Sequence, residues 1–172
     1  VRDAAEKGAD IVELRVDFLG AAADVADSLE ALIETCPVPV IVTYRPTWEG
    51  GQYDGDESER LATLWRAHEL GAAYVDCEAA AAERFFAAKP ASADGKTSPT
   101  KIILSSHNYE ETPSDEELRR IHEECLRAGA DIVKMASVCV DVEDVARLER
   151  LLRETRDAAC ETIVLGMSEH GQ

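Results

Sequence analysis

Apolar segments recur along the chain at a nearly constant spacing. Their starts lie about 29 to 34 residues apart, which is the length of one strand–helix unit in a parallel sheet. Each segment is a continuous apolar run rich in β-branched residues, the pattern of a strand that is buried on both faces. The pattern therefore predicts parallel strands at residues 9–17, 38–45, 72–78, 101–107, 130–136 and 161–167.

Amphipathic segments with helix-ending signals lie between the predicted strands. Residues 57–70 carry leucines and a tryptophan at helical spacing, and Gly71 follows as a C-cap. Residues 114–128 begin with Ser114 and Glu117, the spacing of a capping box. Further helices are expected at residues 1–7, at 141–155 after Asp141, and within the alanine-rich tract 79–93.

Strands that alternate with helices fit two architectures, a doubly wound open sheet and a (β/α)₈ barrel. The sequence opens in a helical segment with no strand before it, and it stops at EHGQ just after a strand. A complete barrel needs roughly 250 residues or somewhat fewer. We therefore expect an α/β fold in which residues 1–172 form one domain, a TIM barrel fragment that lacks about one strand at each end.

The composition is that of a folded and strongly acidic protein. Hydrophobic residues make up 45% of the chain, and 35 acidic against 18 basic residues give a formal charge of −17. This charge argues against nucleic acid and anionic membranes as partners. No apolar run approaches the ~20 residues that span a bilayer, and no signal segment opens the chain, so secretion is not expected. The five cysteines are scattered without zinc-ligand spacing, which indicates a reducing compartment and no metal site.

Charged side chains interrupt the apolar strands near their carboxyl ends. Reactive residues of a parallel barrel come from these ends, and a charge within an apolar strand is costly unless it is paired or functional. The residues that share this placement are Glu13, Arg15, Asp76, Glu78 and Lys134. Two interpretations remain, a buried network of structural ion pairs and an active site. The convergence of these residues on one barrel mouth favours the active site.

Lys134 is the strongest chemical signal. It lies in the apolar segment IVKMA, where the loss of water favours a neutral amine that condenses with a ketone or aldehyde to form a Schiff base. The alternative is a lysine that snorkels at a strand end. His107 ends the preceding strand and is the expected general acid and base. His68 and His122 fall on predicted helices and are expected at the surface.

Arg15 and Arg45 are candidates for binding an anionic substrate, because a guanidinium group matches a carboxylate bidentately and stays charged. Residues 48–55 follow Arg45, and their glycines permit close backbone approach and the mobility that a lid requires. This loop contains no nucleotide-binding glycine motif. No nucleotide cofactor is therefore expected.

These motifs together resemble those of the type I 3-dehydroquinate dehydratases, Schiff-base enzymes of the shikimate pathway. The matching segments cover nearly the whole chain in the family's order: VELRVDFL, VTYRPTWEGGQYDGDE, YVDCE, SSHNYEETPS, GADIVKMAS and GMSEHGQ. TYRPTWEGGQYDGDE and SSHNYEETPS are most similar to the plant-type bifunctional proteins, in which a shikimate dehydrogenase is fused to the dehydratase. The resemblance implies a plastid for a plant-like parent protein and the cytoplasm for a bacterial one.

The resemblance also implies a role for each matching residue. Lys134 matches the Schiff-base lysine, His107 the catalytic histidine, and Glu13 the carboxylate that orients this histidine. The matching substrate-binding positions are Arg15, Arg45, Glu49, Asp76 and Met167. The implied reaction is the dehydration of 3-dehydroquinate to 3-dehydroshikimate, without a metal or another cofactor. The family's arginine that binds the substrate carboxylate follows the segment that ends here at Gln172.

Two other functions stay open. A class I aldolase or transaldolase barrel also uses a strand lysine, but it does not account for the ELRVD and SSHN motifs. The second is a non-catalytic piece of a bifunctional protein, kept for folding or for contact with its fused partner. The joint presence of Glu13, His107 and Lys134 argues against a degenerate site.

Overall fold

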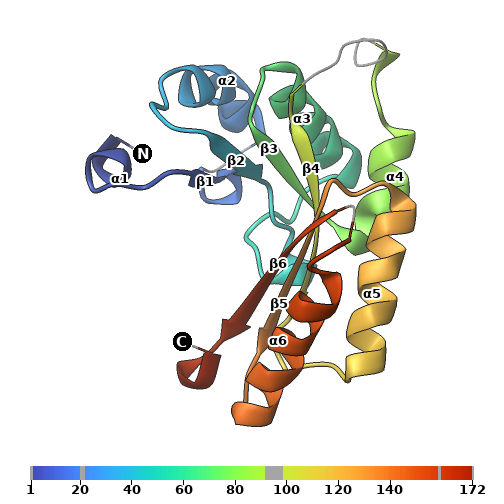
Figure 1. The fold of residues 1–172 in the computed structure, drawn as a ribbon. Coiled ribbons are helices and arrows are strands. Elements are labelled where there is room, and N and C mark those ends of the chain that lie inside the picture. The colour runs from blue at the N-terminus through green and yellow to red at the C-terminus, as the bar shows by residue number, and fades with distance from the viewer. Residues whose placement is uncertain (1, 20–21, 92–98, 159, 172) are drawn as a thin grey trace. The chain divides into compact units, whose positions relative to one another are not determined.

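The structure is a computed structural model that describes residues 2–19, 22–91, 99–158 and 160–171. The chain divides into two compact units, of which the first comprises residues 1–77 and 83–102 and the second residues 78–82 and 103–172. Strands and helices alternate through both units (Figure 1), which confirms the predicted α/β class. No helix in the described ranges is long and apolar enough to cross a membrane.

The first unit is built on the strands β1 (Val12–Arg15), β2 (Val40–Thr43) and β3 (Tyr74–Glu78). Strand β2 pairs in parallel with β1 and with β3. The register aligns Arg15 with Thr43 and Thr43 with Asp76, so these three side chains lie on one face of the sheet. The helical segments from residue 2 to residue 87 are α1 (Arg2–Glu6), η1 (Val16–Phe18), α2 (Ala22–Glu34), η2 (Thr47–Glu49), α3 (Glu57–Glu69), η3 (Ala79–Ala81) and α4 (Ala82–Ala87), of which η3 belongs to the second unit.

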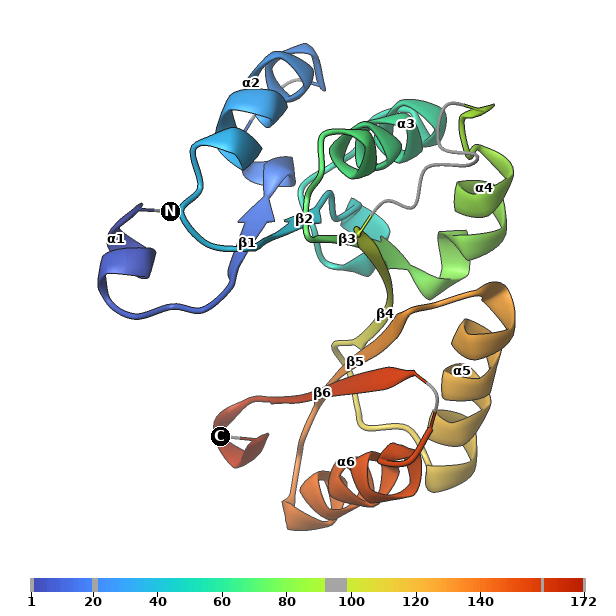
Figure 2. The same cartoon turned by 45° about the horizontal axis from the view of Figure 1, so that its top comes forward.

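Helices α2 and α3 contact each other in the first unit, as Figures 1 and 2 show. Helix α3 begins at the predicted residue and ends one residue before the predicted end, whereas α2 is not among the predicted helices. Val25 and Leu29 of α2 lie one turn apart and are both fully buried. Trp65 of α3 stacks on Phe85 of α4 with 4.5 Å between the ring centroids, and its indole N–H donates to the Phe85 carbonyl. These contacts form the apolar core that supports the sheet.

The second unit is built on β4 (Lys101–Asn108), β5 (Ile132–Val138) and β6 (Glu161–Met167), which pair in parallel in this order. Helix α5 (Asp115–Ala128) contacts β5, and α6 (Val142–Thr155) contacts both α5 and β6 (Figure 1). The short segment η5 (Glu169–Gly171) follows β6. All six predicted strands are therefore present.

Local sequence signals fix the ends of α5. The Ser114 hydroxyl accepts a hydrogen bond from the backbone N–H of Glu117 at 3.2 Å, and Gly129 ends the helix in the left-handed conformation. The predicted capping box is only half formed, because both carboxylate oxygens of Glu117 accept hydrogen bonds from Arg120. The Glu117 side chain therefore does not reach back to the helix start.

His122 is buried, contrary to the surface position expected for it. Only 4% of the residue is exposed, and its Nε2 lies 3.0 Å from the Thr162 hydroxyl on β6. The buried residues of α5 are Leu118, His122 and Cys125, which are spaced four and three residues apart and so share one face of the helix. Burial lowers the pKa of His122 below its ordinary value, and the nearby Glu123 carboxylate opposes this shift only in part.

The buried imidazole predicts a loss of stability in mild acid. Below the ordinary histidine pKa of about 6.5 the unfolded chain takes up a proton that folded His122 resists, so the free energy of unfolding falls as the pH drops through this range. Urea unfolding at pH 7.5 and 5.5 measures the change. A His122→Gln variant should lose part of this pH dependence, whereas the exposed His170→Gln should keep it. Equal pH dependence in both variants would contradict the assignment.

Candidate active site

The predicted site residues fall into two groups, one in each compact unit. The first unit holds Glu13, Arg15, Arg45, Glu49 and Asp76. The second unit holds His107, Lys134 and Met167.

Lys134 lies on β5 and is 9% exposed, so the predicted burial of this lysine is confirmed. The register pairs Lys134 with Ser105 of β4, and it pairs His107 with Ala136. Because side chains alternate between the faces of a strand, His107 and Lys134 lie on the same face of two neighbouring strands. Residues 134, 136 and 138 of β5 share this face, and Met167 of β6 pairs with residue 138. The three predicted residues of the second unit therefore share one sheet face.

The turn after β4 fixes the surroundings of His107. The Asn108 side-chain oxygen accepts hydrogen bonds from the backbone N–H groups of Glu110 and Glu111 at 2.9 and 3.0 Å. The His107 imidazole and the Tyr109 ring are nearly parallel, with 6.3 Å between their centroids. His107 is half-buried, and Tyr109 is exposed. The imidazole therefore lies beside the Tyr109 ring and is partly accessible to solvent.

In the first unit, Arg15 forms a bidentate ion pair with Asp17. Its Nε and Nη2 donate to the two carboxylate oxygens at 2.9 and 2.7 Å. This hydrogen bonding raises the pKa of Arg15 above its ordinary value. Burial on its own would raise the pKa of Asp17, but the Arg15 hydrogen bond and charge, with the backbone N–H groups of Gln52 and Arg45, bring it below its ordinary value. Asp17 was not among the predicted site residues, although its spacing in ELRVD places it two residues beyond Arg15.

A second ion pair joins Arg45 at the end of β2 to Asp76 on β3. Arg45 Nη2 lies 3.0 Å from an Asp76 carboxylate oxygen, and the two side chains are 3% and 0% exposed. On the same sheet face, the Thr43 hydroxyl donates to the Glu13 carboxylate at 2.6 Å. Glu13 itself is exposed, so it is not a charge buried within its strand. The two candidate binding arginines are therefore themselves ion-paired, so structural pairing and a binding role are compatible for these charges.

The buried pair predicts a large effect of Asp76→Asn on stability. The substitution removes the Asp76 charge from its buried pair with Arg45, and removing one partner of a buried pair costs about 3–5 kcal/mol. Chemical denaturation measures the change in the free energy of unfolding. Glu154→Gln makes the matched change in the exposed pair with Arg119 and should leave the unfolding midpoint unaltered. An unaltered midpoint for Asp76→Asn would show that the pair does not stabilise the fold.

The segment after Arg45 is a hydrogen-bonded turn, and Gly51 confirms the close backbone approach that its glycines predict. The backbone N–H of Gly51 donates to the Pro46 carbonyl at 2.9 Å, and that of Tyr53 donates to the Arg45 carbonyl at 3.2 Å. A Cβ atom on Gly51 would collide with the Arg45 backbone. Glycine is therefore required for close packing at this position. Glu49 is half-buried within this turn.

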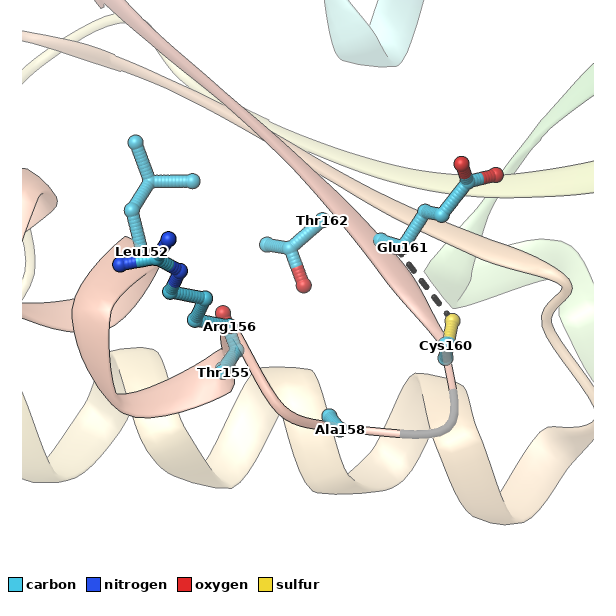
Figure 3. Close-up of a pocket in the computed structure, with 7 residues that line it drawn as sticks. All are labelled: Leu152, Thr155, Arg156, Ala158, Cys160, Glu161 and Thr162. Carbon is cyan, nitrogen blue, oxygen red and sulfur yellow. Dashed lines mark hydrogen bonds between the residues drawn. The ribbon is translucent and has the colours of Figure 1, made fainter.

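A cavity of about 360 Å³ lies elsewhere, at the start of β6 (Figure 3). Met167 is the last residue of this strand and so lies at its opposite end. The cavity contains none of the predicted site residues. Its lining residues are Leu152, Thr155, Arg156, Ala158, Cys160, Glu161 and Thr162. Across the described ranges, no three His, Cys, Asp or Glu side chains gather in an arrangement that could hold a metal ion.

Sequence comparison relates the chain to one enzyme family along its whole length. The family model described as type I 3-dehydroquinase matches residues 1–172. The chain is 45% identical over 166 residues to the chloroplastic bifunctional 3-dehydroquinate dehydratase/shikimate dehydrogenase of Arabidopsis thaliana, covering 96% of this chain and 26% of that protein. It is 38% identical to the 3-dehydroquinate dehydratase of Methanosarcina mazei, covering 99% of this chain and 72% of the relative.

Solved structures of 3-dehydroquinate dehydratases are also similar to this chain. The 3-dehydroquinate dehydratase of Geobacillus kaustophilus superposes with a TM-score of 0.85 at 27% identity, covering 98% of this chain and 67% of that one. The enzyme of Aquifex aeolicus superposes with a TM-score of 0.76 at 31% identity, covering 99% of this chain and 74% of that one. These relatives are named as dehydratases, which favours the dehydratase over the aldolase interpretation. The expected fold is confirmed as that of the type I dehydroquinases, whose barrels are longer than this chain.

Proposed function

The chain belongs to the type I 3-dehydroquinase family, and from this membership we propose that it carries out the dehydration of 3-dehydroquinate to 3-dehydroshikimate through a lysine imine. The observation that carries the proposal is the placement of Lys134 and His107 on one face of neighbouring strands. The chain spans 26% of the length of its plant relative and 72% of the Methanosarcina mazei relative. The activity is therefore proposed for the protein to which these residues belong.

The proposed reaction begins at the Lys134 amine. The amine adds to the substrate ketone, and the resulting carbinolamine loses water to give the imine. The imine withdraws electrons from the adjacent carbon, so His107 can remove a proton from it. The electrons left on that carbon expel the neighbouring hydroxyl group, which leaves as water after protonation. Addition of water to the imine then releases 3-dehydroshikimate and restores the amine.

The remaining predicted residues are assigned to binding and orientation in this proposal. Glu13 orients His107, Arg15 and Arg45 bind the substrate's oxygen atoms, and Met167 lines the site. Glu49 and Asp76 support these groups. Two contacts in the first unit favour this assignment, namely the Thr43 hydrogen bond to Glu13 and the ion pair of Arg45 with Asp76.

The carboxylate assignment predicts unequal effects of two matched substitutions. Glu13→Gln removes the charge proposed to orient the histidine, so the maximal turnover rate should fall by about 10-fold or more. Glu49→Gln should chiefly raise the substrate concentration needed for half-maximal rate. Steady-state kinetics on both variants separate these effects. If Glu49→Gln lowers the maximal rate more than Glu13→Gln does, the orienting role belongs to Glu49.

The plant relative also bears on the protein's partner and location. It is bifunctional and chloroplastic, whereas the Methanosarcina mazei relative is named for the dehydratase alone. The higher identity to the plant protein supports a fused shikimate dehydrogenase and a plastid location for the parent protein over a single-function enzyme of the cytoplasm. Sequencing the transcript beyond the codon for Gln172 tests the fusion directly.

Borohydride reduction in the presence of 3-dehydroquinate tests the function itself. Reduction converts the proposed imine into a stable amine, which intact-mass measurement detects and peptide mapping locates. The chain has five lysines, and the adduct should lie on Lys134 rather than on Lys7, Lys89, Lys96 or Lys101. A folded protein that forms no adduct at saturating substrate would contradict the proposal and support a non-catalytic role.

A further inference from the structure

Asp17 lies at the centre of the first group of candidate site residues. Its side chain is fully buried, and both of its oxygens accept hydrogen bonds. Besides the two bonds from Arg15, it accepts the backbone N–H of Gln52 at 3.1 Å and, more weakly, that of Arg45 at 3.4 Å. One carboxylate therefore links the end of β1, the end of β2 and the turn that follows it.

The pairing with Asp17 fixes the position and the plane of the Arg15 guanidinium. A bidentate contact defines both, and the Phe18 ring lies 4.9 Å from Arg15 Cζ. A third of the Arg15 side chain remains exposed. An arginine that is already held in one conformation loses less rotamer freedom when it binds a ligand. The pair therefore prepares Arg15 for contact with a substrate.

The turn that carries Glu49 depends on the same carboxylate. The Gln52 N–H points to Asp17, and the neighbouring Gly51 packs against the Arg45 backbone without room for a side chain. Without the carboxylate the Gln52 N–H would lose its acceptor. The turn would then lose its hydrogen bond to the segment that follows β1. Arg15 and Glu49 should therefore shift together when Asp17 is changed.

We propose that Asp17 is a positioning residue of the active site, which holds Arg15 and the Glu49 turn in place for substrate without touching substrate itself. The inference rests on the proposed function. A positioning role and a purely electrostatic role of Asp17 predict opposite changes in substrate affinity. Asp17→Asn removes a negative charge beside Arg15, so charge alone predicts tighter binding of anionic 3-dehydroquinate. Loss of positioning predicts weaker binding.

The dependence of borohydride trapping on the 3-dehydroquinate concentration shows whether Asp17→Asn strengthens or weakens binding. For Asp17→Asn we expect the half-saturating 3-dehydroquinate concentration to rise about tenfold, the loss that one charge-assisted hydrogen bond carries. The maximal yield of adduct on Lys134 should stay the same, because the amine is untouched. Asp10→Asn, the same change at an exposed position ahead of β1, should alter neither value. Unchanged or tighter binding by Asp17→Asn would overturn the inference.

A double-substitution cycle tests whether Asp17 acts through Arg15. If Asp17 acts through Arg15, Asp17→Asn should have a smaller effect in a chain that already carries Arg15→Gln. The logarithm of the half-saturating concentration should then rise by less than half of the rise that Asp17→Asn causes in the wild-type chain. A residue that only stabilises the fold would give the full effect in both backgrounds. Full additivity would therefore overturn the role proposed for Asp17.

The unmodified protein provides a test that does not depend on a variant folding. Hydrogen exchange measured by NMR should be slow at the Gln52 amide and at Arg15 Nε–H, because both hydrogens lie in bonds to Asp17. Fast exchange at both would overturn the inference.

A wild-type chain without an adduct contradicts the proposed function. A wild-type chain that is trapped, with an Asp17→Asn variant that binds equally well, contradicts the inference alone.

Discussion

A Lys134→Ala variant is expected to form no reducible adduct with 3-dehydroquinate and to lose turnover by a factor on the order of 10⁴ or more. The physical reason is that alanine offers no amine, so the electron-withdrawing imine cannot form. The hydrogen on the adjacent carbon then keeps the low acidity that it has in the ketone. Lys134 is the buried lysine of β5, on the sheet face shared with His107. Mass spectrometry after borohydride reduction measures the adduct, and absorbance of the conjugated product measures turnover.

Two further variants make the Lys134 result specific. Lys134→Met keeps most of the side-chain volume, so a matching loss in this variant shows that the amine, rather than a cavity, matters. Lys101→Ala removes an exposed lysine at the start of β4 and should retain the adduct. An adduct of undiminished yield in Lys134→Ala would show that the imine forms on another lysine, and the Schiff-base assignment would then be wrong.

A His107→Ala variant is expected to turn over about 10²–10⁴ times more slowly, the usual contribution of a positioned general acid and base. His107 is half-buried on β4, on the same face as Lys134 and beside the Tyr109 ring. The imidazole is proposed to move protons during both imine formation and elimination. Both the rate of trapping and the rate of product formation should therefore fall, and stopped-flow mixing followed by reduction separates the two.

The histidine prediction has a matched control. His170→Ala removes an exposed imidazole from η5 and should leave both rates near their original values. A loss below about tenfold in His107→Ala would be too small for a general acid and base. In that case His107 would hold substrate or shape the turn after β4, and another group would transfer the proton.

Local physical chemistry explains what could be predicted from sequence. Helices α3, α5 and α6 begin and end close to their predicted bounds, because Ser114 and Asp141 cap helix starts and Gly129 adopts the left-handed conformation at a helix end. The strands follow from continuous β-branched runs. The burial of Lys134 was equally evident, since it lies between apolar neighbours in its own strand.

Helix α2 is not predicted, although its sequence carries a helical period. Val25 and Leu29 are spaced by one helical turn and are both buried, so the helical period was available in the sequence. The segment that precedes them falls in part outside the described residues, as do residues 92–98 of the expected surface loop.

Other features were decided by which segments the fold brings together. The Glu117 side chain binds Arg120 instead of the helix start, and His122 is buried with its Nε2 beside the Thr162 hydroxyl of β6. The sequence identified Arg15 as a binding residue, yet the ion pair with Asp17 depends on a side-chain orientation that spacing does not specify. The link from Asp17 to Gln52 joins residues 35 positions apart.

The sequence by itself therefore determined the order of the elements, the ends of α3, α5 and α6 to within a residue or two, and the placement of Lys134 and His107 on one face of neighbouring strands. Each of these follows from neighbours within a few residues or from the alternation of parallel strands. The tertiary structure alone decided which charges are paired, which histidine is buried and which carboxylate holds Arg15. Those outcomes depend on the competition among several partners for one charged group, and only the packed fold sets the distances that decide it.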